Sequence, residues 1–336
     1  MEYGAIDLHA RYTWIRLVTA DGVVTYEGRV PTTREQLTAA FTGRPPARVL
    51  VESSTESEWV AQTIEACGHE VVVASPGYAL MYGHRDPRIK TDRRDVVALA
   101  EACRRGIYRR AHRVSGEQRQ RRRELKVREL LVRQRTALIN LLRAELRQEG
   151  LRLRTCAAEG VVRQYRALTI PAAVAAGLAL VIAALEDLSD AIAASTAALT
   201  ATASADPIVR RLQTAPGIGP ITGLTYRAVL DDVRRFGDAR GVAAYVGLVP
   251  KEDSSGDRKR RGRITKAGPT GLRVLLIQAS WVVWRQREGG GALYAWVQRL
   301  AARRGKRIAV VALARRLARI LYAMWRDEKD FRVQPA

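Results

Sequence analysis

Four acidic residues have types and positions that suit metal-dependent chemistry. Asp7 and Glu52 lie in short apolar segments that predict strands, and Asp92 and Asp95 lie three residues apart at the start of a predicted helix, hence on one helix face. A buried carboxylate is costly unless a positive charge compensates it. Carboxylate oxygens suit Mg²⁺, and two ions ~3.5–4 Å apart can activate the attacking and leaving oxygens at a phosphate. The four acids therefore predict a site for Mg²⁺ (or Mn²⁺) that acts on phosphodiesters.

Three of the four acids, taken alone, also have a structural explanation. Asp92 favours a helix N-terminus, Asp95 can pair with Arg94 or Arg105, and Glu52 can be a surface acid. The order of all four acids along the predicted elements favours the shared metal site over these separate explanations.

The elements that must position these acids alternate between strands and helices. The dipeptide Asp21-Gly22 is typical of a hairpin turn, and the segment 48–54 is apolar without alternation, as in a central buried strand. The predicted strands lie at 4–10, 13–20, 23–31, 48–54 and 70–75, and the predicted helices at 34–42, 58–67 and 90–106. This order predicts a mixed α/β sheet.

The charge of the chain points to a polyanionic partner. Lys and Arg number 57 against 34 Asp and Glu, a net charge of +23. Each Lys or Arg side chain that meets a phosphate releases condensed counterions, which favours binding, and arginine can bind a phosphate with two hydrogen bonds. A GC-rich genome would explain arginine over lysine but not the net charge. We expect a nucleic-acid partner, with an anionic membrane surface as the lesser alternative.

The cysteines and histidines form no recognisable disulfide or zinc-binding pattern. The three scattered cysteines suit neither disulfides nor zinc, and no metal-ligand spacing joins them to the four histidines. The N-terminus runs directly into a predicted strand without a signal peptide, and the longest apolar run, 171–185, is shorter than the ~20 residues of a membrane span. We expect a cytoplasmic bacterial protein, associated with the nucleoid, with no membrane partner.

Three motifs in the first third resemble a known family. The segments AIDLH at 5–9, VESS at 51–54 and KTDRRD at 90–95 are similar to the N-terminal domain of the DEDD insertion-sequence transposases, the IS-one-ten group. The resemblance implies a ribonuclease-H-like fold of the Holliday-junction-resolvase type over residues 1–108. It also assigns Asp7, Glu52, Asp92 and Asp95 as catalytic metal ligands.

Residues 109–205 are predicted to be mainly helical. Segments 117–149 and 172–202 have helical patterns, and the first carries a leucine stripe at spacings of seven and four. The alternatives are a solvated helical linker and an antiparallel pair that dimerises and contacts nucleic acid, which we favour. In the family this region is a coiled coil used in assembly. The basic residues expected to contact nucleic acid here are Arg119, Arg121, Arg122 and Arg123.

The last part, 206–330, combines a glycine turn with a basic stretch. The segment TAPGIGP at 214–220 resembles a helix-hairpin-helix turn, in which Gly217 and Gly219 would bring backbone N–H groups to a phosphate; a simple turn between helices is the alternative. YVGLVP at 245–250 and GRITKAG at 262–268 resemble the C-terminal domain of the same family. The basic stretch expected to bind nucleic acid comprises Arg258, Lys259, Arg260, Arg261, Arg263 and Lys266.

The resemblance identifies Ser255 as the nucleophile, with the adjacent Ser254 as the alternative. A serine hydroxyl can attack a phosphodiester and conserve the bond as a phosphoserine link, but it needs a base or a metal ion for activation. The family implies that the acidic cluster supplies this, in a composite site. Without the resemblance, Ser254 and Ser255 would suit a flexible turn. Pro269 stands where the family usually has Asn, which leaves the next helix start in question.

Three packed helices are expected over 270–325, with their tryptophans in the core and with basic side chains such as Arg273 on faces that could line DNA. The complete hypothesis is a transposase that recombines donor and target DNA as a homo-oligomer, a dimer or tetramer. The family adds guidance by a bridge RNA. The alternatives are a Mg²⁺-dependent Holliday-junction-resolving endonuclease without a covalent intermediate, and a non-catalytic scaffold.

Overall fold

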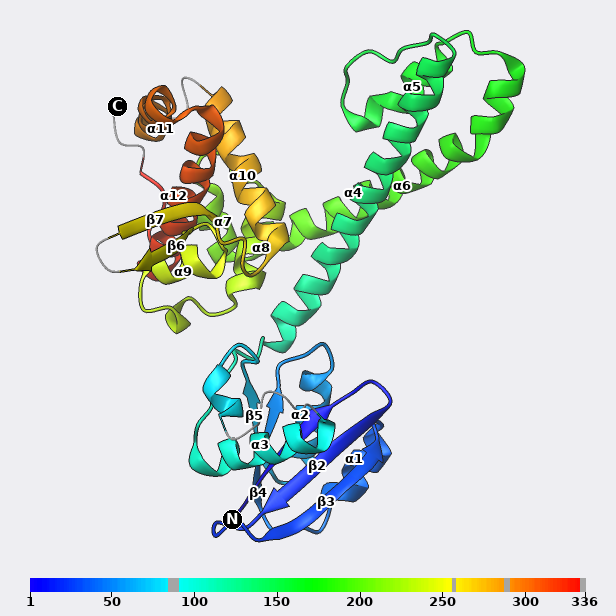
Figure 1. Ribbon diagram of the computed structural model, residues 1–336. Helices are drawn as coiled ribbons and strands as arrows, with labels where there is room; N and C mark the ends of the chain where they lie inside the picture. The colour runs from blue at the N-terminus through cyan, green and yellow to red at the C-terminus, as the bar shows by residue number, and fades with distance from the viewer. Residues whose placement is uncertain (84–90, 256–257, 287–290, 333–336) are drawn as a thin grey trace. The chain divides into compact units, whose positions relative to one another are not determined.

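The computed structural model describes residues 1–83, 91–255, 258–286 and 291–332, with the backbone alone for 253–255 and 258–261 (Figure 1). The chain divides into two compact units, Met1–Arg113 and Val114–Ala336. The first unit is built on a sheet, and the second consists mostly of helices.

The first unit contains a five-stranded sheet in the order β3-β2-β1-β4-β5. The central strand β1 pairs antiparallel with β2 and parallel with β4, so the sheet is mixed. The strands are β1 (Glu2–Leu8), β2 (Tyr12–Val18), β3 (Val24–Pro31), β4 (Ala47–Glu52) and β5 (Glu70–Ala74). The helices are α1 (Arg34–Phe41), α2 (Ser57–Ala66), η1 (Ala79–Tyr82) and α3 (Asp92–Arg105). The predicted mixed α/β sheet is confirmed.

Helices cover both faces of this sheet because alternate strand residues on both faces are apolar. Ile6 and Val51 belong to the cluster that packs against α1 and α2, whereas their neighbours Ala5 and Leu50 belong to the cluster that packs against α3. The Thr91 side chain caps the N-terminus of α3 by accepting a hydrogen bond from the Arg94 N–H. Burial on both faces fixes the register of β1 and β4, and hence the places of the residues at their carboxyl ends.

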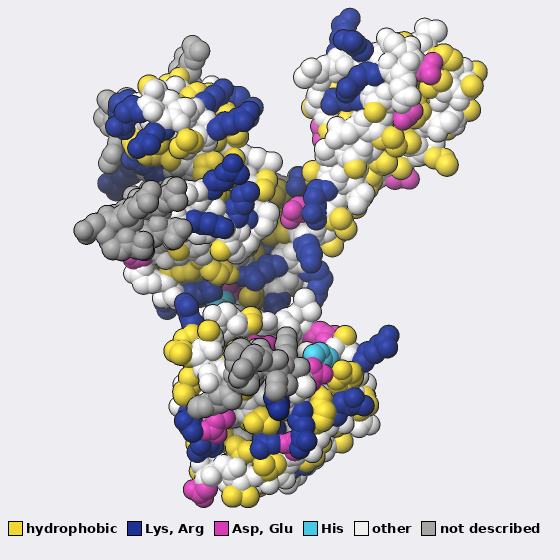
Figure 2. Space-filling view, viewed as in Figure 1, with side chains coloured by type: hydrophobic (Ala, Val, Ile, Leu, Met, Phe, Trp, Pro, Cys, Tyr) yellow, Lys and Arg dark blue, Asp and Glu magenta, His cyan; other side chains and the backbone are white. Residues whose placement is uncertain are grey.

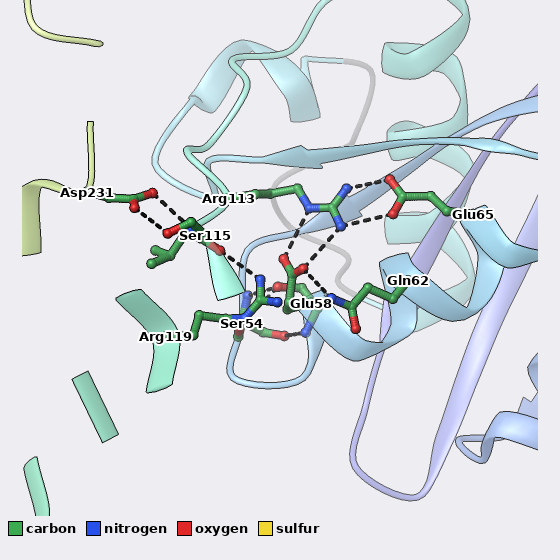
Figure 3. A network of polar contacts seen from close by, with 10 residues as sticks. Ser54, Glu58, Gln62, Glu65, Arg113, Ser115, Arg119 and Asp231 are labelled. Carbon is green, nitrogen blue, oxygen red and sulfur yellow. Dashed lines mark hydrogen bonds and ion pairs between the residues drawn. The ribbon is translucent and has the colours of Figure 1, made fainter. Parts of the chain in front are cut away.

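The segment that ends the first unit is held by ion pairs and by backbone hydrogen bonds. The Arg113 guanidinium donates to both carboxylate oxygens of Glu58, at 3.1 and 3.2 Å, and to the carboxylate of Glu65 (Figure 3). The Ala111 N–H donates to the Val73 carbonyl at 2.8 Å. These contacts join the segment to α2 and β5.

Two long helices, α4 (Gly116–Gln148) and α6 (Ala172–Ala205), pack against each other in the second unit. Arg121 near the start of α4 contacts Thr202 near the end of α6, and Leu142 further along α4 clusters with Leu178 near the start of α6, so the pair is antiparallel. Between them lie η2 (Ala158–Gly160) and α5 (Val161–Arg166). The two predicted long helices are present, each within a few residues of its expected bounds.

Helix α6 is longer than its apolar run suggested. It continues past Glu186 and Asp187 to Ala205, and among the described residues it is the one helix that is long and apolar enough to cross a membrane. A single such helix is weak evidence, because core helices of soluble proteins share this character. Leu178, Ile182 and Leu185 pack against α4, whereas Leu199 and Ala203 cluster with residues of the following helices. Only 17% of the apolar 18-residue window of α6 is buried.

The remaining helices of the second unit surround one apolar core. Tyr226 lies fully buried and donates to the Ala318 carbonyl at 2.8 Å, and Trp325 packs against its ring. The helices are α7 (Pro207–Gln213), α8 (Pro220–Leu230), η3 (Val233–Arg235), α9 (Ala239–Tyr245), α10 (Thr270–Arg285), α11 (Gly291–Arg304) and α12 (Lys306–Arg326). The three helices predicted for 270–325 are confirmed, and α10 begins directly after Pro269.

A two-stranded hairpin, β6 (Pro250–Ser255) and β7 (Arg258–Ile264), joins α9 to α10. The sequence pattern did not predict it, because both strands are rich in charged residues and have no apolar face. The tryptophans expected in the core divide into two groups: Trp325 is buried, whereas Trp281, Trp284 and Trp296 are half-buried. The expectation of core positions for these three is therefore only partly met.

Candidate functional site

The carboxyl ends of two neighbouring strands hold Asp7 and Glu52. Ile6 of β1 pairs with Val51 of β4, so Asp7 and Glu52 occupy the next register position. Asp7 lies two residues after Ala5, and Glu52 lies two residues after Leu50, both of which pack towards α3. Since side chains alternate between the faces of a sheet, both acids lie on the α3 side.

Helix α3 brings the other two acids to the same side. Asp92 and Asp95 lie in its first turn, and Val96 and Leu99 anchor the helix in the apolar cluster beneath β1 and β4. Asp95 is only 8% exposed. All four predicted acids therefore belong to one face of one sheet.

The electrostatics around Asp7 are those of crowded carboxylates. Burial raises the pKa of Asp7, and the charges of Asp92 and Asp95 raise it further, whereas His9 lowers it through its charge and a hydrogen bond. The net result is a raised pKa of Asp7. A positive ion at this position would relieve both the desolvation and the repulsion.

His9 joins this cluster, and our sequence analysis missed it. Its Nε2 atom lies 3.1 Å from Asp7 Oδ2 and 3.5 Å from Asp92 Oδ2. The Tyr12 hydroxyl donates to Asp92 Oδ2 at 3.3 Å. The available signal was the i, i+2 spacing of Asp7 and His9 at the end of a strand, which puts both on one face.

The donor set fits a divalent cation. Ligand atoms of Asp7, His9 and Asp92 all lie within 4.8 Å of one another. The Oε1 atom of Glu52 is shielded from solvent. Glu52 and Asp95 lie on the same side of the sheet but are not part of this group of three. Two carboxylates with an imidazole can hold Mg²⁺ or Mn²⁺, and such an ion would neutralise charge that this chain otherwise holds at a cost.

Comparison of the sequence with known proteins places this chain in a family. A family model of the DEDD IS110 type, described as "Transposase", matches residues 5–150, and a model described as "Transposase IS116/IS110/IS902 family" matches residues 209–295. The chain is 33% identical over 306 residues to a "Probable family 20 transposase" of Pseudomonas aeruginosa, an alignment that covers 89% of this chain and 90% of the relative. The chain belongs to the IS110 family of transposases.

Other relatives agree with this assignment. The "Transposase for insertion sequence element IS1111A" of Coxiella burnetii is 31% identical over 93% of this chain and 86% of its own length. The "Transposase for insertion sequence element IS1328" of Yersinia enterocolitica is 29% identical, with 87% of each chain covered. The protein is thus an insertion-sequence transposase, an enzyme that cuts and rejoins DNA.

Several arginines of the basic segment 119–123 of the transposase make contacts within the second unit. Arg122 donates from Nε to the Ala228 carbonyl at 2.8 Å and from Nη2 to the Val229 carbonyl at 2.7 Å, at the end of α8. Burial lowers the pKa of Arg122. Arg121 contacts Glu124 and Thr202, and Arg119 donates to the Val114 carbonyl. Arg123 is exposed and contacts Gln120 on its own helix.

The start of α4 is also fixed within the second unit. The Ser115 side chain caps the helix, and Asp231 accepts hydrogen bonds from the Ser115 N–H at 3.0 Å and from its hydroxyl at 2.6 Å (Figure 3). This pair, together with Arg122, ties the first turns of α4 to the end of α8.

Of the two glycines in the predicted helix-hairpin-helix turn, the backbone requires glycine at one position but not at the other. Gly217 has φ +78°, and a Cβ there would lie 2.5 Å from the Ala279 carbonyl oxygen, so only glycine fits. Gly219 precedes α8 with φ −90°, and a Cβ there would meet nothing within 4 Å. The turn does join two helices, α7 and α8, as its motif predicts.

The motifs YVGLVP and GRITKAG pack against each other. A Cβ on Gly247 would lie 2.2 Å from the Ala267 carbonyl oxygen, and one on Gly268 would lie 2.0 Å from the Tyr245 carbonyl oxygen. Arg273 donates to the Val246 and Ala267 carbonyls at 2.9 and 2.8 Å. Arg273 is only 6% exposed, so its expected place on a DNA-lining face is wrong: its guanidinium joins the two motifs instead.

The predicted nucleophile lies in the β6–β7 hairpin. Ser255 is the last residue of β6 and pairs with Arg258, and Ser254 pairs with Lys259. The side chains of Ser254, Ser255, Arg258, Lys259, Arg260 and Arg261 lie outside the described residues. Further along, Arg263 and Lys266 are exposed.

Proposed function

We propose that this transposase recombines DNA through the Ser255 hydroxyl, assisted by Mg²⁺ or Mn²⁺ ions that Asp7, Glu52, Asp92 and Asp95 hold. The observation that carries the proposal is the position of all four acids on the α3 face of the sheet. The Oγ attacks the phosphorus and loses its proton to solvent, the bond from phosphorus to a deoxyribose oxygen breaks, and that oxygen takes up a proton, so the exchange is balanced. Attack by another strand's hydroxyl then reverses the exchange and frees the serine.

A divalent ion bound by the acids would neutralise charge on the phosphate and lower the proton affinity of an attacking oxygen. The protein's own contribution is to hold the carboxylates. Their backbone positions are set by paired strands and by a capped helix.

We propose three functional regions along the chain. Residues 1–108 form a ribonuclease-H-like catalytic domain, for which the central β1 with a parallel β4 and an antiparallel β2 is the support. Residues 109–205 form a coiled-coil assembly region for a dimer or tetramer, supported by the α4–α6 pair. Residues 206–330 form the C-terminal transposase domain with the glycine turn and the serine hairpin.

Donor and target DNA, and a bridge RNA, are the proposed partners. The exposed Arg123, Arg263 and Lys266 support direct phosphate contacts, as does the open backbone around Gly219. Arg119, Arg121 and Arg122 would shape this surface through their contacts within the unit. Gly217, Arg258, Lys259, Arg260 and Arg261 complete the proposed binding set.

The deciding experiment is a search for a covalent protein–DNA adduct. The full-length protein is incubated with Mg²⁺ and end-labelled element-end DNA, denatured, and separated by electrophoresis. We expect an adduct in the wild type and in Ser254→Ala, and none in Ser255→Ala. Adduct formation that is lost in Ser254→Ala but not in Ser255→Ala would identify Ser254 as the nucleophile.

The same experiment tests the alternative enzyme. Strand cleavage in both serine variants, with no adduct in any of them, would overturn the serine mechanism. It would favour a Mg²⁺-dependent Holliday-junction-resolving endonuclease that uses water as its nucleophile.

A further inference from the structure

We infer that His9 is a ligand, through Nε2, of the ion that Asp7 and Asp92 bind. The inference rests on the proposed function and extends it, because the four-acid motif assigns no nitrogen ligand to this site. His9 follows β1 directly, at the turn that leads into β2.

The distances match those between neighbouring ligands of a small cation. Nε2 lies 3.1 Å from Asp7 Oδ2 and 3.5 Å from Asp92 Oδ2. Two ligands at ~2.1 Å from one ion, in adjacent octahedral positions, lie ~3 Å apart. The imidazole nitrogen therefore sits where the third corner of such a site would be.

The position of His9 Nε2 indicates that His9 binds the ion directly and does not merely orient a carboxylate that binds it. A histidine that only orients a metal-binding carboxylate contacts one carboxylate on the side away from the ion. Nε2 instead lies between carboxylates from two elements, Asp7 on β1 and Asp92 on α3. The His9 side chain is 40% exposed, so an ion can reach it from solvent.

The backbone holds His9 in place at both of its polar groups. Its N–H donates to the Tyr12 carbonyl at 3.2 Å, and its carbonyl accepts from the Thr32 hydroxyl at 2.7 Å. The Tyr12 hydroxyl also donates to Asp92 Oδ2. The centroids of the Tyr12 and His9 rings lie 5.4 Å apart. One tight turn thus positions both the imidazole and one carboxylate before any ion binds.

A nitrogen ligand changes which ions the site prefers. Mg²⁺ favours oxygen ligands, whereas imidazole binds first-row transition ions more readily. We therefore expect the site to prefer Mn²⁺ over Mg²⁺ by a larger factor than an all-carboxylate site would. Loss of His9 should weaken Mn²⁺ binding about tenfold and Mg²⁺ binding less.

Mn²⁺ is the probe because it is paramagnetic. Full-length protein loaded with one equivalent of Mn²⁺ is examined by electron spin echo envelope modulation, which detects a ¹⁴N nucleus bonded to the ion. We expect the ¹⁴N modulation in the wild type and its loss in His9→Gln, with circular dichroism confirming the fold. Mn²⁺ titrations followed by electron paramagnetic resonance, and Mg²⁺ titrations by calorimetry, give the two affinities.

Matched variants keep the outcomes distinct. Tyr12→Phe removes a hydrogen bond to Asp92, and His112→Gln removes an exposed histidine elsewhere in the same unit; both should retain the modulation. Modulation that persists in both His9→Gln and His9→Asn overturns the inference, as does its absence from a wild type whose Mn²⁺ binding needs Asp7. Mn²⁺ binding that is unaffected by Asp7→Asn would instead overturn the proposed metal site itself.

Discussion

The two units of this transposase differ sharply in charge. Residues 1–113 hold 16 Lys and Arg against 14 Asp and Glu, a net charge of +2. Residues 114–336 hold 41 against 20, a net charge of +21. The excess that marks the chain as a nucleic-acid-binding protein therefore belongs almost entirely to the second unit.

The arginines of the two units are also used differently. In the first unit many pair with nearby acids, as Arg48 does with Glu70 and Arg113 with Glu58. Helices α10, α11 and α12 contain no Asp or Glu at all. Figure 2 shows Lys and Arg side chains gathered over this part of the second unit. If the first unit holds the proposed metal site and the basic second unit binds the DNA, substitutions in the two units should cause separable defects.

The largest effect should come from the acids of the first unit. Asp95→Asn removes a charge from the cluster at constant size, and we expect strand cleavage to fall about 10³-fold, or ~4 kcal/mol in the barrier. Binding of element-end DNA, measured by fluorescence anisotropy, should stay within twofold.

The control is Asp21→Asn, which removes an exposed acid from a turn outside the cluster. Cleavage by Asp95→Asn at the wild-type rate would contradict the division of roles, because strand cleavage would then not depend on this acid.

The second effect concerns stability, and it separates the two glycines of the turn. Gly217→Ala forces a Cβ against the Ala279 carbonyl at φ +78° and should cost about 2 kcal/mol in the unfolding free energy. Gly219→Ala meets open space and should be close to neutral. Urea unfolding followed by tryptophan fluorescence measures both. Equal losses would mean that the turn is not packed as described.

A smaller effect should come from single cations of the second unit. Arg263→Gln and Lys266→Gln should each lower the slope of log K against log salt by ~1 and weaken DNA binding a few-fold, whatever the DNA sequence. Arg109→Gln, an exposed arginine of the first unit, is the matched control. If it changes the slope equally, the charge difference between the units does not predict where DNA binds.

The smallest effect is a pH dependence of stability in the first unit. The pKa of Asp7 is raised above its ordinary 3.8, so the folded state holds this proton more tightly than the unfolded state does. That contribution to stability is present at low pH and is lost as the pH rises through the folded-state pKa. Thermal unfolding in EDTA should therefore show a decline with rising pH that is weaker in Asp7→Asn.

Divalent ions should reverse this loss. When only the folded state binds Mg²⁺, a Mg²⁺ concentration of about 100 times the Kd raises the free energy of unfolding by ~2.7 kcal/mol. We expect the wild type, but not Asp7→Asn, to gain thermal stability from Mg²⁺ at pH 7. An equal gain in both would place the ion elsewhere.

Much of the first unit could be predicted because both of its sheet faces are buried. Alternation and apolar runs located all five strands within a few residues, and the α3 pattern placed Asp92 and Asp95 together. The β6–β7 hairpin could not be predicted in this way, since its strands are charged and its pairing depends on where α9 and α10 place its ends.

The sequence by itself determined the strands of the first unit, the two long helices, the order of the four acids and the excess of cations, because periodicity and composition act locally. Only the tertiary structure decided which charged side chains serve the interior. Arg122 reaches carbonyls more than a hundred residues away, and Arg273 joins two motifs, because unpaired carbonyl oxygens at helix ends and tight turns need donors. His9 likewise meets Asp92 only because α3 packs onto β1, a contact that no local pattern contains.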